Sequence, residues 1–291
     1  MTAGLRHERM HASGLDLHVV RAGAGPPVIL LHGFPDGWRS WRHQIGALAD
    51  AGFSVLAPDL RGYDGSDRPS HRSAYALPHL VADVAALVRS TGAARAHVAG
   101  HDWGGLVAWA LAGWQPELVD RLAIVNAPHP RIFAEKVWRT PQFLRSSYVL
   151  FFALPWLPER VLAARDFAAV RQMLRRVPYR TGAFDEATID ECVEALAWPG
   201  ALRAALDYYR ENLLSRRPML LAAQTRVAAE TLVIWGERDP ALGLELLDGL
   251  ERVAPRARVH RIPDAGHWAH NEVPDRVNRL LVEFLGGETE G

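Results

Sequence analysis

The chain has 291 residues, of which 49% are hydrophobic and 23% charged. This composition provides for one large globular domain, or for one domain that carries an insertion. The 33 basic and 33 acidic residues cancel, which argues against the basic surface typical of nucleic-acid-binding proteins and of proteins held on anionic membranes. The single cysteine, Cys192, excludes an internal disulfide and a multi-cysteine metal site.

The ends and apolar runs of the chain bear on where the protein resides. The stretch "MTAGLRHERMHASG" is too polar to be the core of a secretory signal. No run approaches the roughly 20 apolar residues of a membrane span. We therefore expect a cytoplasmic protein whose partner is a small neutral molecule, with no nucleic acid and no membrane as partners. The composition leaves the oligomeric state open.

Short apolar runs alternate with longer helical patterns, and this alternation predicts an α/β fold with a mostly parallel sheet. Strands are predicted at 15–23, 26–33, 53–60, 95–100, 121–128, 229–236 and 258–263, and helices at 38–51, 76–91, 105–114 and 274–285. Between residues 131 and 226 the strand signals disappear, and aromatic residues and arginines dominate. We interpret 131–226 as a helical lid inserted between two core parts, 1–130 and 227–291. Such a lid would cover the carboxyl ends of the strands, where ligands of open α/β sheets bind.

The stretch "VAGHDWGGLVAWA" joins a predicted strand to a predicted helix through a glycine-rich turn. A nucleophile elbow has this layout and normally exposes a serine, but here Asp102 occupies the turn. Gly104 and Gly105 would let helix and strand pack closely. A strained turn that exposes a carboxylate brings no packing benefit, so Asp102 is the candidate nucleophile.

Three further motifs each follow a predicted strand: "HGFPD" at 32–36, "WGERD" at 235–239 and "AGHW" at 265–268. The chain order of nucleophile, acid and histidine is that of α/β-hydrolases. With these motifs nearly the whole chain resembles the α/β-hydrolase family, and more narrowly its lid-bearing epoxide hydrolases. The resemblance implies the α/β-hydrolase fold with a central sheet flanked by helices.

The resemblance also implies a role for each motif. His267 would be the general base and Asp239 the acid that orients it. The backbone amides of Phe34 and Trp103 would form the oxyanion hole. Asp264 is a rival for the acid, but it lies on the histidine's own loop, where a turn role fits better.

Two polar residues near these motifs are not assigned to the chemistry. In some relatives the acid follows the preceding strand, where this chain has Asn126, which cannot serve as an acid. His101, beside the nucleophile, should point away from it and be structural.

An aspartate nucleophile indicates alkyl transfer. A serine that attacked an epoxide or alkyl halide would form an ether, which water does not readily cleave. A carboxylate forms an ester instead, and a histidine-activated water can hydrolyse it. Asp102 thus argues against an ordinary esterase, lipase or peptidase, and it favours epoxide opening or carbon–halogen cleavage.

Epoxide opening needs a donor for the developing alkoxide, and the resemblance implies two lid tyrosines. Tyr209 in "ALDYYREN" matches one motif, and Tyr148 in "SSYVLFFALP" matches the other. Tyr208 should face elsewhere, because consecutive helical residues point about 100° apart. The plain alternative is that these tyrosines only pack the lid helices.

The apolar residues near the motifs predict the wall of the substrate site. Trp38, Phe151, Phe152 and Trp156 are the candidates, and they suit a small hydrophobic epoxide, aryl or alkyl. The mechanism implies no cofactor and no metal.

Two other functions remain open. A haloalkane or haloacid dehalogenase would use the same triad. Trp103 sits where dehalogenases keep a halide-binding tryptophan, but epoxide hydrolases often carry a tryptophan there too. Phe34 replaces the second halide donor of dehalogenases, an asparagine. Trp103 also replaces the arginine typical of fluoroacetate dehalogenases, so both departures favour epoxides. The other alternative is a non-catalytic small-molecule receptor. Loss of Asp102 or His267 would point to a receptor, but both residues are present.

Overall fold

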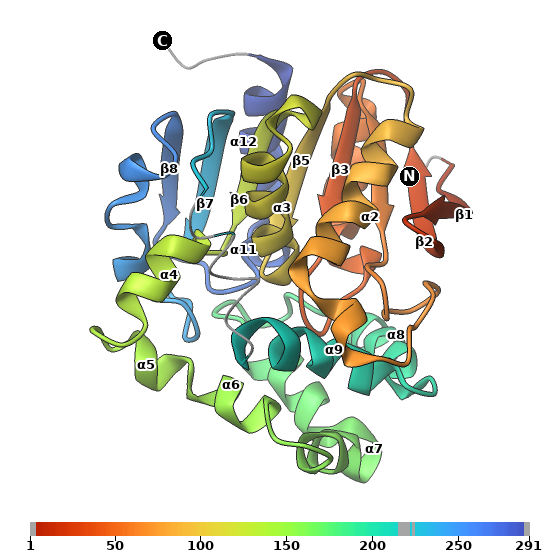
Figure 1. Ribbon diagram of the computed structural model, residues 1–291, viewed down its shortest axis with the longest axis vertical. Coiled ribbons are helices and arrows are strands. Elements are labelled where there is room, and N and C mark those ends of the chain that lie inside the picture. Colours follow the sequence, from red (N-terminus) through yellow and green to blue (C-terminus); the bar gives the residue numbers. More distant parts are fainter. Residues whose placement is uncertain (1–3, 215–221, 223–224, 288–291) are drawn as a thin grey trace.

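The computed structural model describes residues 4–214, 222 and 225–287, which are built around an eight-stranded sheet (Figure 1). The strand order is β1-β2-β4-β3-β5-β6-β7-β8. The strands are β1 (Arg6–Ala12), β2 (Leu15–Ala22), β3 (Pro27–Leu31), β4 (Ser54–Pro58), β5 (Ala96–His101), β6 (Val119–Val125), β7 (Glu230–Gly236) and β8 (Ala257–Ile262). Strand β2 pairs antiparallel with both β1 and β4, and all other pairs are parallel. The prediction of an α/β fold with a mostly parallel sheet is confirmed.

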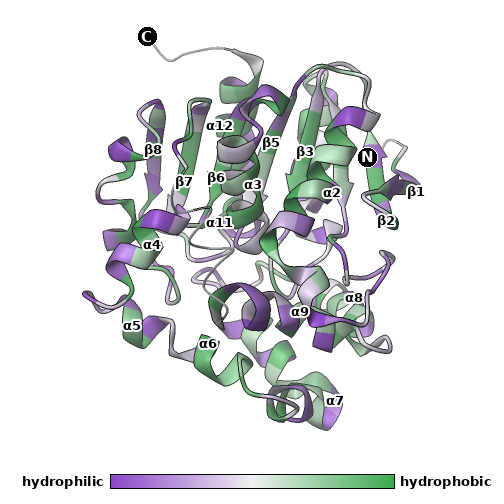
Figure 2. Cartoon of the chain, in the orientation of Figure 1, coloured by the Kyte–Doolittle hydropathy of each residue, from purple (hydrophilic) through white to green (hydrophobic). Residues whose placement is uncertain are grey.

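The central strands are apolar because helices cover both faces of the sheet. Every residue of β5 is buried, and four of the five residues of β3 are buried. Figure 2 shows β3 largely in green, the colour of hydrophobic residues. Helices α2 (Leu77–Ser90) and α3 (Trp103–Trp114) pack on one face, and α1 (Arg42–Asp50), α11 (Ala269–Glu272) and α12 (Pro274–Gly286) pack on the other.

Helices also fill the segment between β6 and β7. They are α4 (Pro130–Lys136), α5 (Gln142–Arg145), α6 (Ser147–Phe152), α7 (Leu157–Arg176), α8 (Glu186–Ala197) and α9 (Ala201–Tyr209). The described residues of this segment form no strand, in keeping with the expected helical insertion. In Figure 1 these helices lie across the end of the sheet at which the parallel strands finish. The domain bounds at 131 and 226 stay a prediction.

Three local predictions need correction. Strand β1 was not predicted, because most of its side chains are exposed polar groups on the sheet edge and leave no apolar run. The helix predicted at 38–51 divides into a 3₁₀ turn at Trp38–Trp41 and helix α1, and the carboxylate of Asp59 accepts a bond from the amide of Trp38 in that turn. Helix α3 begins at Trp103, directly after the nucleophile position. No helix of the described part of the chain is long and apolar enough to cross a membrane.

Candidate active site

Asp102 lies in the sharp turn between β5 and α3. Its backbone adopts φ 50° and ψ −119°, a region that non-glycine residues rarely occupy. The turn depends on close backbone approach. A Cβ atom at Gly104 would lie 2.2 Å from the carbonyl oxygen of Leu31, and one at Gly33 would lie 2.4 Å from the Cβ of Asp102. These glycines let the turn and the neighbouring loop meet, which aims the carboxylate of Asp102 at the end of the sheet.

Backbone amides hold the carboxylate of Asp102. The N–H of Phe34 donates to Oδ1 at 2.9 Å, and the amide of Trp103 donates to the same carboxylate. Burial raises the pKa of Asp102, while the charge of His267 and these two amides oppose the rise. The same amides are therefore placed to stabilise negative charge that develops on this carboxyl group.

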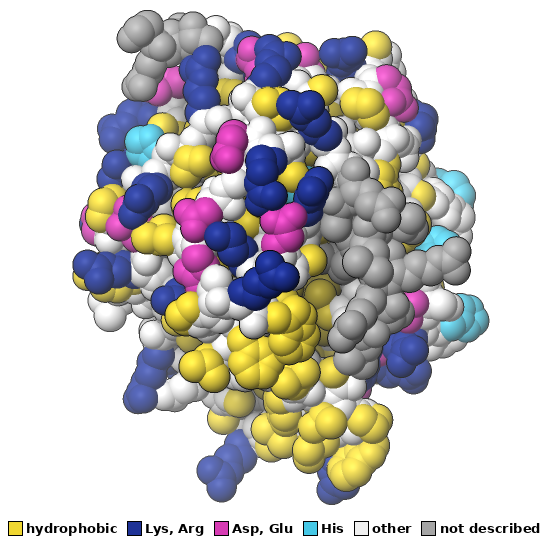
Figure 3. Space-filling view, turned by 60° about the vertical axis from the view of Figure 1, so that its left-hand side comes forward, with side chains coloured by type: hydrophobic (Ala, Val, Ile, Leu, Met, Phe, Trp, Pro, Cys, Tyr) yellow, Lys and Arg dark blue, Asp and Glu magenta, His cyan; other side chains and the backbone are white. Residues whose placement is uncertain are grey.

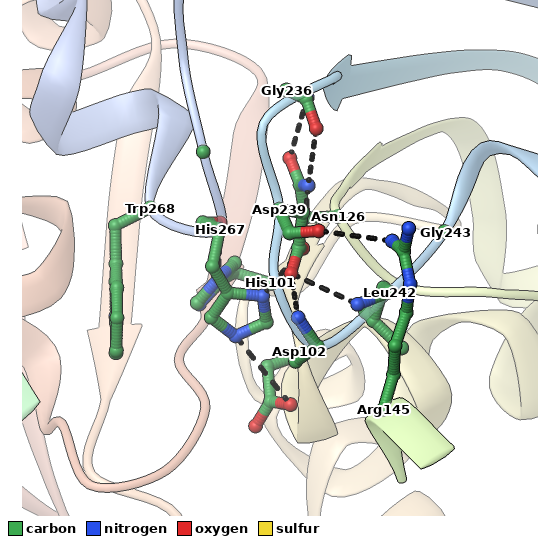
Figure 4. A network of polar contacts seen from close by, with 12 residues as sticks. His101, Asp102, Asn126, Arg145, Gly236, Asp239, Leu242, Gly243, His267 and Trp268 are labelled. Carbon is green, nitrogen blue, oxygen red and sulfur yellow. Dashed lines mark hydrogen bonds and ion pairs between the residues drawn. The ribbon is translucent and has the colours of Figure 1, made fainter. Parts of the chain in front are cut away.

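The imidazole of His267 lies between two carboxylates (Figure 4). Its Nδ1 is 2.8 Å from Oδ2 of Asp239, and its Nε2 is 3.8 Å from Oδ2 of Asp102. Burial lowers the pKa of His267, but the charge and hydrogen bond of Asp239 and the charge of Asp102 outweigh it and raise this pKa to about 9. A proton on Nδ1 leaves Nε2 facing Asp102, the orientation that a general base needs.

Asp239 is itself fixed by several donors. The amides of Ala241 and Leu242 donate to Oδ1 at 2.8 and 2.9 Å, and the side-chain amide of Asn126 donates to Oδ2 at 2.8 Å. Asn126 follows β6 with φ 42°, and its Oδ1 accepts from the amide of Gly236. Asn126 therefore holds the carboxylate of Asp239 in place, a role that was not predicted from the sequence. Its position at the end of the strand beside β7 is the signal that could have identified it.

The residues that the sequence analysis set apart from the triad lie as expected. Asp264 is half exposed and forms an ion pair with Arg180 at the surface, away from the histidine ring. His101 is buried, and its Nε2 lies 3.0 Å from the backbone oxygen of His267. It contacts the backbone and the ring of His267, with ring centroids 4.7 Å apart, which is consistent with the expected structural role.

A pocket adjoins Asp102 between the sheet and the helical insertion. Tyr148 of α6 and Tyr209 of α9 line it, with ring centroids 6.3 Å apart. The rest of the lining is mostly apolar: Leu106, Pro128, Phe133, Val149, Leu213 and Leu242. Burial, with the charge of Asp102 added, raises the pKa of both tyrosines, so each keeps its hydroxyl proton as a donor. The hydroxyl of Tyr208 points away and donates to the backbone oxygen of Arg61 at 2.8 Å, as expected.

Two of the four predicted wall residues lie near this pocket, and two do not. Phe152 packs against Phe34 and Tyr209, with ring centroids 5.4 and 5.1 Å apart, and Phe151 packs behind it. Trp156 is 63% exposed on the outside of the insertion. Trp38 contacts His7 of the edge strand and the core on the α1 side of the sheet. The expectation for Trp38 and Trp156 is corrected, because an aromatic residue in sequence does not reveal which way it faces.

A buried polar cluster of Asp36, Ser40 and Trp268 lies beside His267 and was not predicted from the sequence. The carboxylate of Asp36 accepts from the indole N–H of Trp268 at 2.9 Å and from the hydroxyl of Ser40 at 3.0 Å. Burial raises the pKa of Asp36 to about 6, although these two bonds oppose the rise. The ring of Trp268 packs edge-on against His267 at 4.9 Å. Asp36 thus joins the loop after β3 to the loop that carries His267. Its place at the end of "HGFPD" is the sequence signal that could have pointed to this role.

Comparison with known proteins agrees with this geometry. Residues 26–274 match the family model of the alpha/beta hydrolase fold. The chain is 36% identical to the AB hydrolase superfamily protein YfhM of Bacillus subtilis, over 97% of this chain and 98% of that protein. It is 37% identical to human epoxide hydrolase 4, over 97% of this chain and 78% of that protein.

Solved structures give the same result. A crystal structure of Bacillus megaterium epoxide hydrolase with an inhibitor superposes with a TM-score of 0.87 at 28% identity, covering 96% of this chain and all of that one. Epoxide hydrolase A of Mycobacterium thermoresistibile gives 0.84 at 30% identity, covering 98% and 99%. The chain belongs to the α/β-hydrolase fold family, and within that family to the epoxide hydrolases.

Proposed function

We propose that the protein is an epoxide hydrolase that converts a small hydrophobic epoxide to a vicinal diol. One observation carries the proposal: a carboxylate on a nucleophile elbow and two protonated tyrosines line the same apolar pocket. The names of the relatives and of the structural neighbours agree with it. The family mechanism uses no cofactor and no metal.

The first step is ring opening. Asp102 attacks one epoxide carbon from the side opposite the carbon–oxygen bond, and an ester bond forms as that carbon–oxygen bond breaks. Tyr148 and Tyr209 donate hydrogen bonds to the leaving oxygen and stabilise the alkoxide. Their raised pKa values support this role, because a tyrosine must hold its proton to act as a donor.

The second step is ester hydrolysis. His267, held by Asp239, takes a proton from water, and the resulting hydroxide attacks the carbonyl carbon of the Asp102 ester. The amides of Phe34 and Trp103 stabilise the oxyanion. The tetrahedral intermediate then collapses, and the bond between the carbonyl carbon and the alkyl oxygen breaks. The proton on His267 and the proton of the new Asp102 carboxyl group pass to the two alkoxide oxygens, so that the diol leaves and the carboxylate is restored. Once Asp102 is esterified its charge is gone, which removes one of the groups that raise the pKa of His267. The imidazole therefore loses its proton more easily in the step that needs it as a base.

A product assay separates this proposal from its alternatives. The purified protein is given a panel of aryl and alkyl epoxides and haloalkanes, and diol and halide are both measured. We expect diol. Halide without diol would assign the protein to the dehalogenases, and the absence of both products would favour a receptor.

We expect Tyr209→Phe to lower the rate constant of ring opening at least about tenfold, and the Tyr148→Phe/Tyr209→Phe pair to lower it about a thousandfold. The reason is that each hydroxyl donates to an oxygen that is negative only during ring opening. The measurement is single-turnover kinetics. Tyr179→Phe is the control, since Tyr179 is 52% exposed. Full activity of Tyr209→Phe on every epoxide tried would remove this tyrosine from the mechanism.

We expect Asp239→Asn to lower kcat about 10²- to 10⁴-fold, because an amide N–H facing Nδ1 favours the tautomer with its proton on Nε2, which is no base toward water. Asp264→Asn is the matched control and should keep nearly full activity. If the two variants were equally damaged, the acid would not be Asp239.

The same variant should alter the dependence of stability on pH. In the folded protein the pKa of His267 is raised to about 9, so its ion pair stabilises the fold fully below about pH 6.5, and this contribution is lost as the pH rises through about 9. The difference in Tm between the wild type and Asp239→Asn should therefore shrink between pH 6.5 and pH 10. A difference that grew with pH would contradict the assigned charge state.

We also propose that the protein acts in the cytoplasm on a small hydrophobic molecule, without nucleic acid. The single buried cysteine supports a reducing compartment. Measuring the enzyme in fractions of the source cell would test the location.

A further inference from the structure

Eleven large hydrophobic side chains stay exposed in the described part of the chain, and eight of them lie between residues 138 and 161. We name these eight the cap patch: Trp138, Phe143, Leu144, Leu150, Leu154, Trp156, Leu157 and Val161. Figure 3 shows hydrophobic side chains gathered at the lower end of the molecule, which α5, α6 and α7 form in Figure 1. The exposed fractions reach 73% for Leu144 and 64% for Trp138. Contiguous exposed apolar surface of this kind marks a site of interaction.

The charge of the same segment indicates what covers the cap patch. Residues 131–180 carry ten basic and three acidic side chains. Acidic residues from outside this segment pair with four of the ten: Lys136, Arg171, Arg175 and Arg180. Of the acidic three, Glu135, Glu159 and Asp166, each forms an ion pair with an arginine. Among the residues that the structure describes, the exposed arginines Arg139, Arg160 and Arg165 have no ion-pair partner. Three exposed arginines without an ion-pair partner in the described part of the chain therefore lie among or close to the residues of the cap patch in the sequence.

We propose that the cap patch docks on the surface of an anionic lipid bilayer. Exposed indoles and leucines flanked by arginines are the combination with which peripheral proteins enter the boundary between headgroups and acyl chains. A second copy of this chain fits less well, because pairing two cap patches would bring their uncompensated arginines together. The contact is peripheral and needs no spanning helix.

Docking would also orient the pocket. Helix α6 contributes Tyr148 and Val149 to the pocket and Leu150 to the cap patch. A bilayer that covers the cap patch would therefore lie close to the helix that lines the pocket. Hydrophobic compounds dissolve in such a bilayer, so the substrate would be concentrated near the pocket. This consequence rests on the proposed function, whereas the docking itself does not.

The test is flotation of the full-length protein with vesicles of phosphatidylcholine alone and with vesicles that contain 30% phosphatidylglycerol. We expect binding to the anionic vesicles that weakens as salt is added. The Arg139→Glu/Arg160→Glu pair should weaken this binding at least about tenfold. Trp138→Gln/Leu144→Gln should weaken it too. The matched control is Arg95→Glu/Arg258→Glu, which makes the same change of charge at exposed sites beside the amino ends of β5 and β8 and should bind like the wild type.

Several results would overturn the proposal. They are the absence of vesicle binding, equal binding to neutral vesicles, and equal loss in the control pair. A concentration-dependent dimer that Leu144→Gln dissociates, without vesicle binding, would assign the cap patch to a second copy. Circular dichroism of each variant confirms that it is folded. Because vesicle binding needs no turnover, failure of the docking and failure of the epoxide activity are measured separately.

Discussion

Replacing Asp102 with alanine is expected to lower kcat for epoxide hydrolysis at least about 10⁴-fold. The proposed mechanism has no second nucleophile: without the carboxylate no ester forms. The tyrosines and the oxyanion amides would still bind substrate, so binding should weaken far less than turnover. Diol formation at saturating epoxide and equilibrium binding of an unreactive analogue are the two measurements.

Loss of activity in Asp102→Ala should not reflect unfolding. Burial raises the pKa of Asp102, which means that the ionised carboxylate is held at a cost in the folded protein. Alanine removes that cost but also removes a partner of His267, so we expect Tm to stay within about 4 °C of the wild type. A folded variant with wild-type turnover would eliminate Asp102 as the nucleophile.

The sequence predicted the central sheet and the triad because both depend on local, repeated signals. Asp102 and Asp239 follow the buried strands β5 and β7, His267 follows the edge strand β8, and parallel strands bring their carboxyl ends to one edge of the sheet. Their convergence then follows from topology, even though they are far apart in the chain. Tyr209 was instead implied by the resemblance to epoxide hydrolases, and it lines the pocket beside Asp102.

What the sequence did not predict depends on tertiary contacts. Trp38 and Trp156 are large aromatic residues near the motifs, as Phe152 is, and the sequence does not distinguish them. Only the packing of the insertion decides that Phe152 faces Tyr209 while Trp156 faces outward. Asn126 carries no charge, and its role exists only because β6 lies beside β7. The lack of ion-pair partners, in the described part of the chain, for three arginines near the cap patch likewise follows from tertiary contacts.

Replacing His267 with glutamine should divide the reaction at its covalent intermediate. Ring opening needs the carboxylate of Asp102 and the tyrosines, whereas ester hydrolysis needs a base. We therefore expect one rapid turnover without release of diol, and a kcat at least about 10³-fold below that of the wild type. The intact mass of the protein should rise by the mass of one epoxide molecule, and digestion should locate this addition on the peptide that contains Asp102.

The geometry of the site favours this division of the reaction into two steps. Nε2 of His267 lies 3.8 Å from Oδ2 of Asp102, so the two groups form an ion pair, and the carboxylate has no short hydrogen bond to this histidine to break before it attacks. Glutamine keeps a polar group beside the carboxylate but does not accept a proton from water. The double variant Asp102→Ala/His267→Gln is the control and should show no added mass. If His267→Gln released diol without a mass increase, water would attack the epoxide directly. Asp102 would then be the base, and the ester would not be an intermediate.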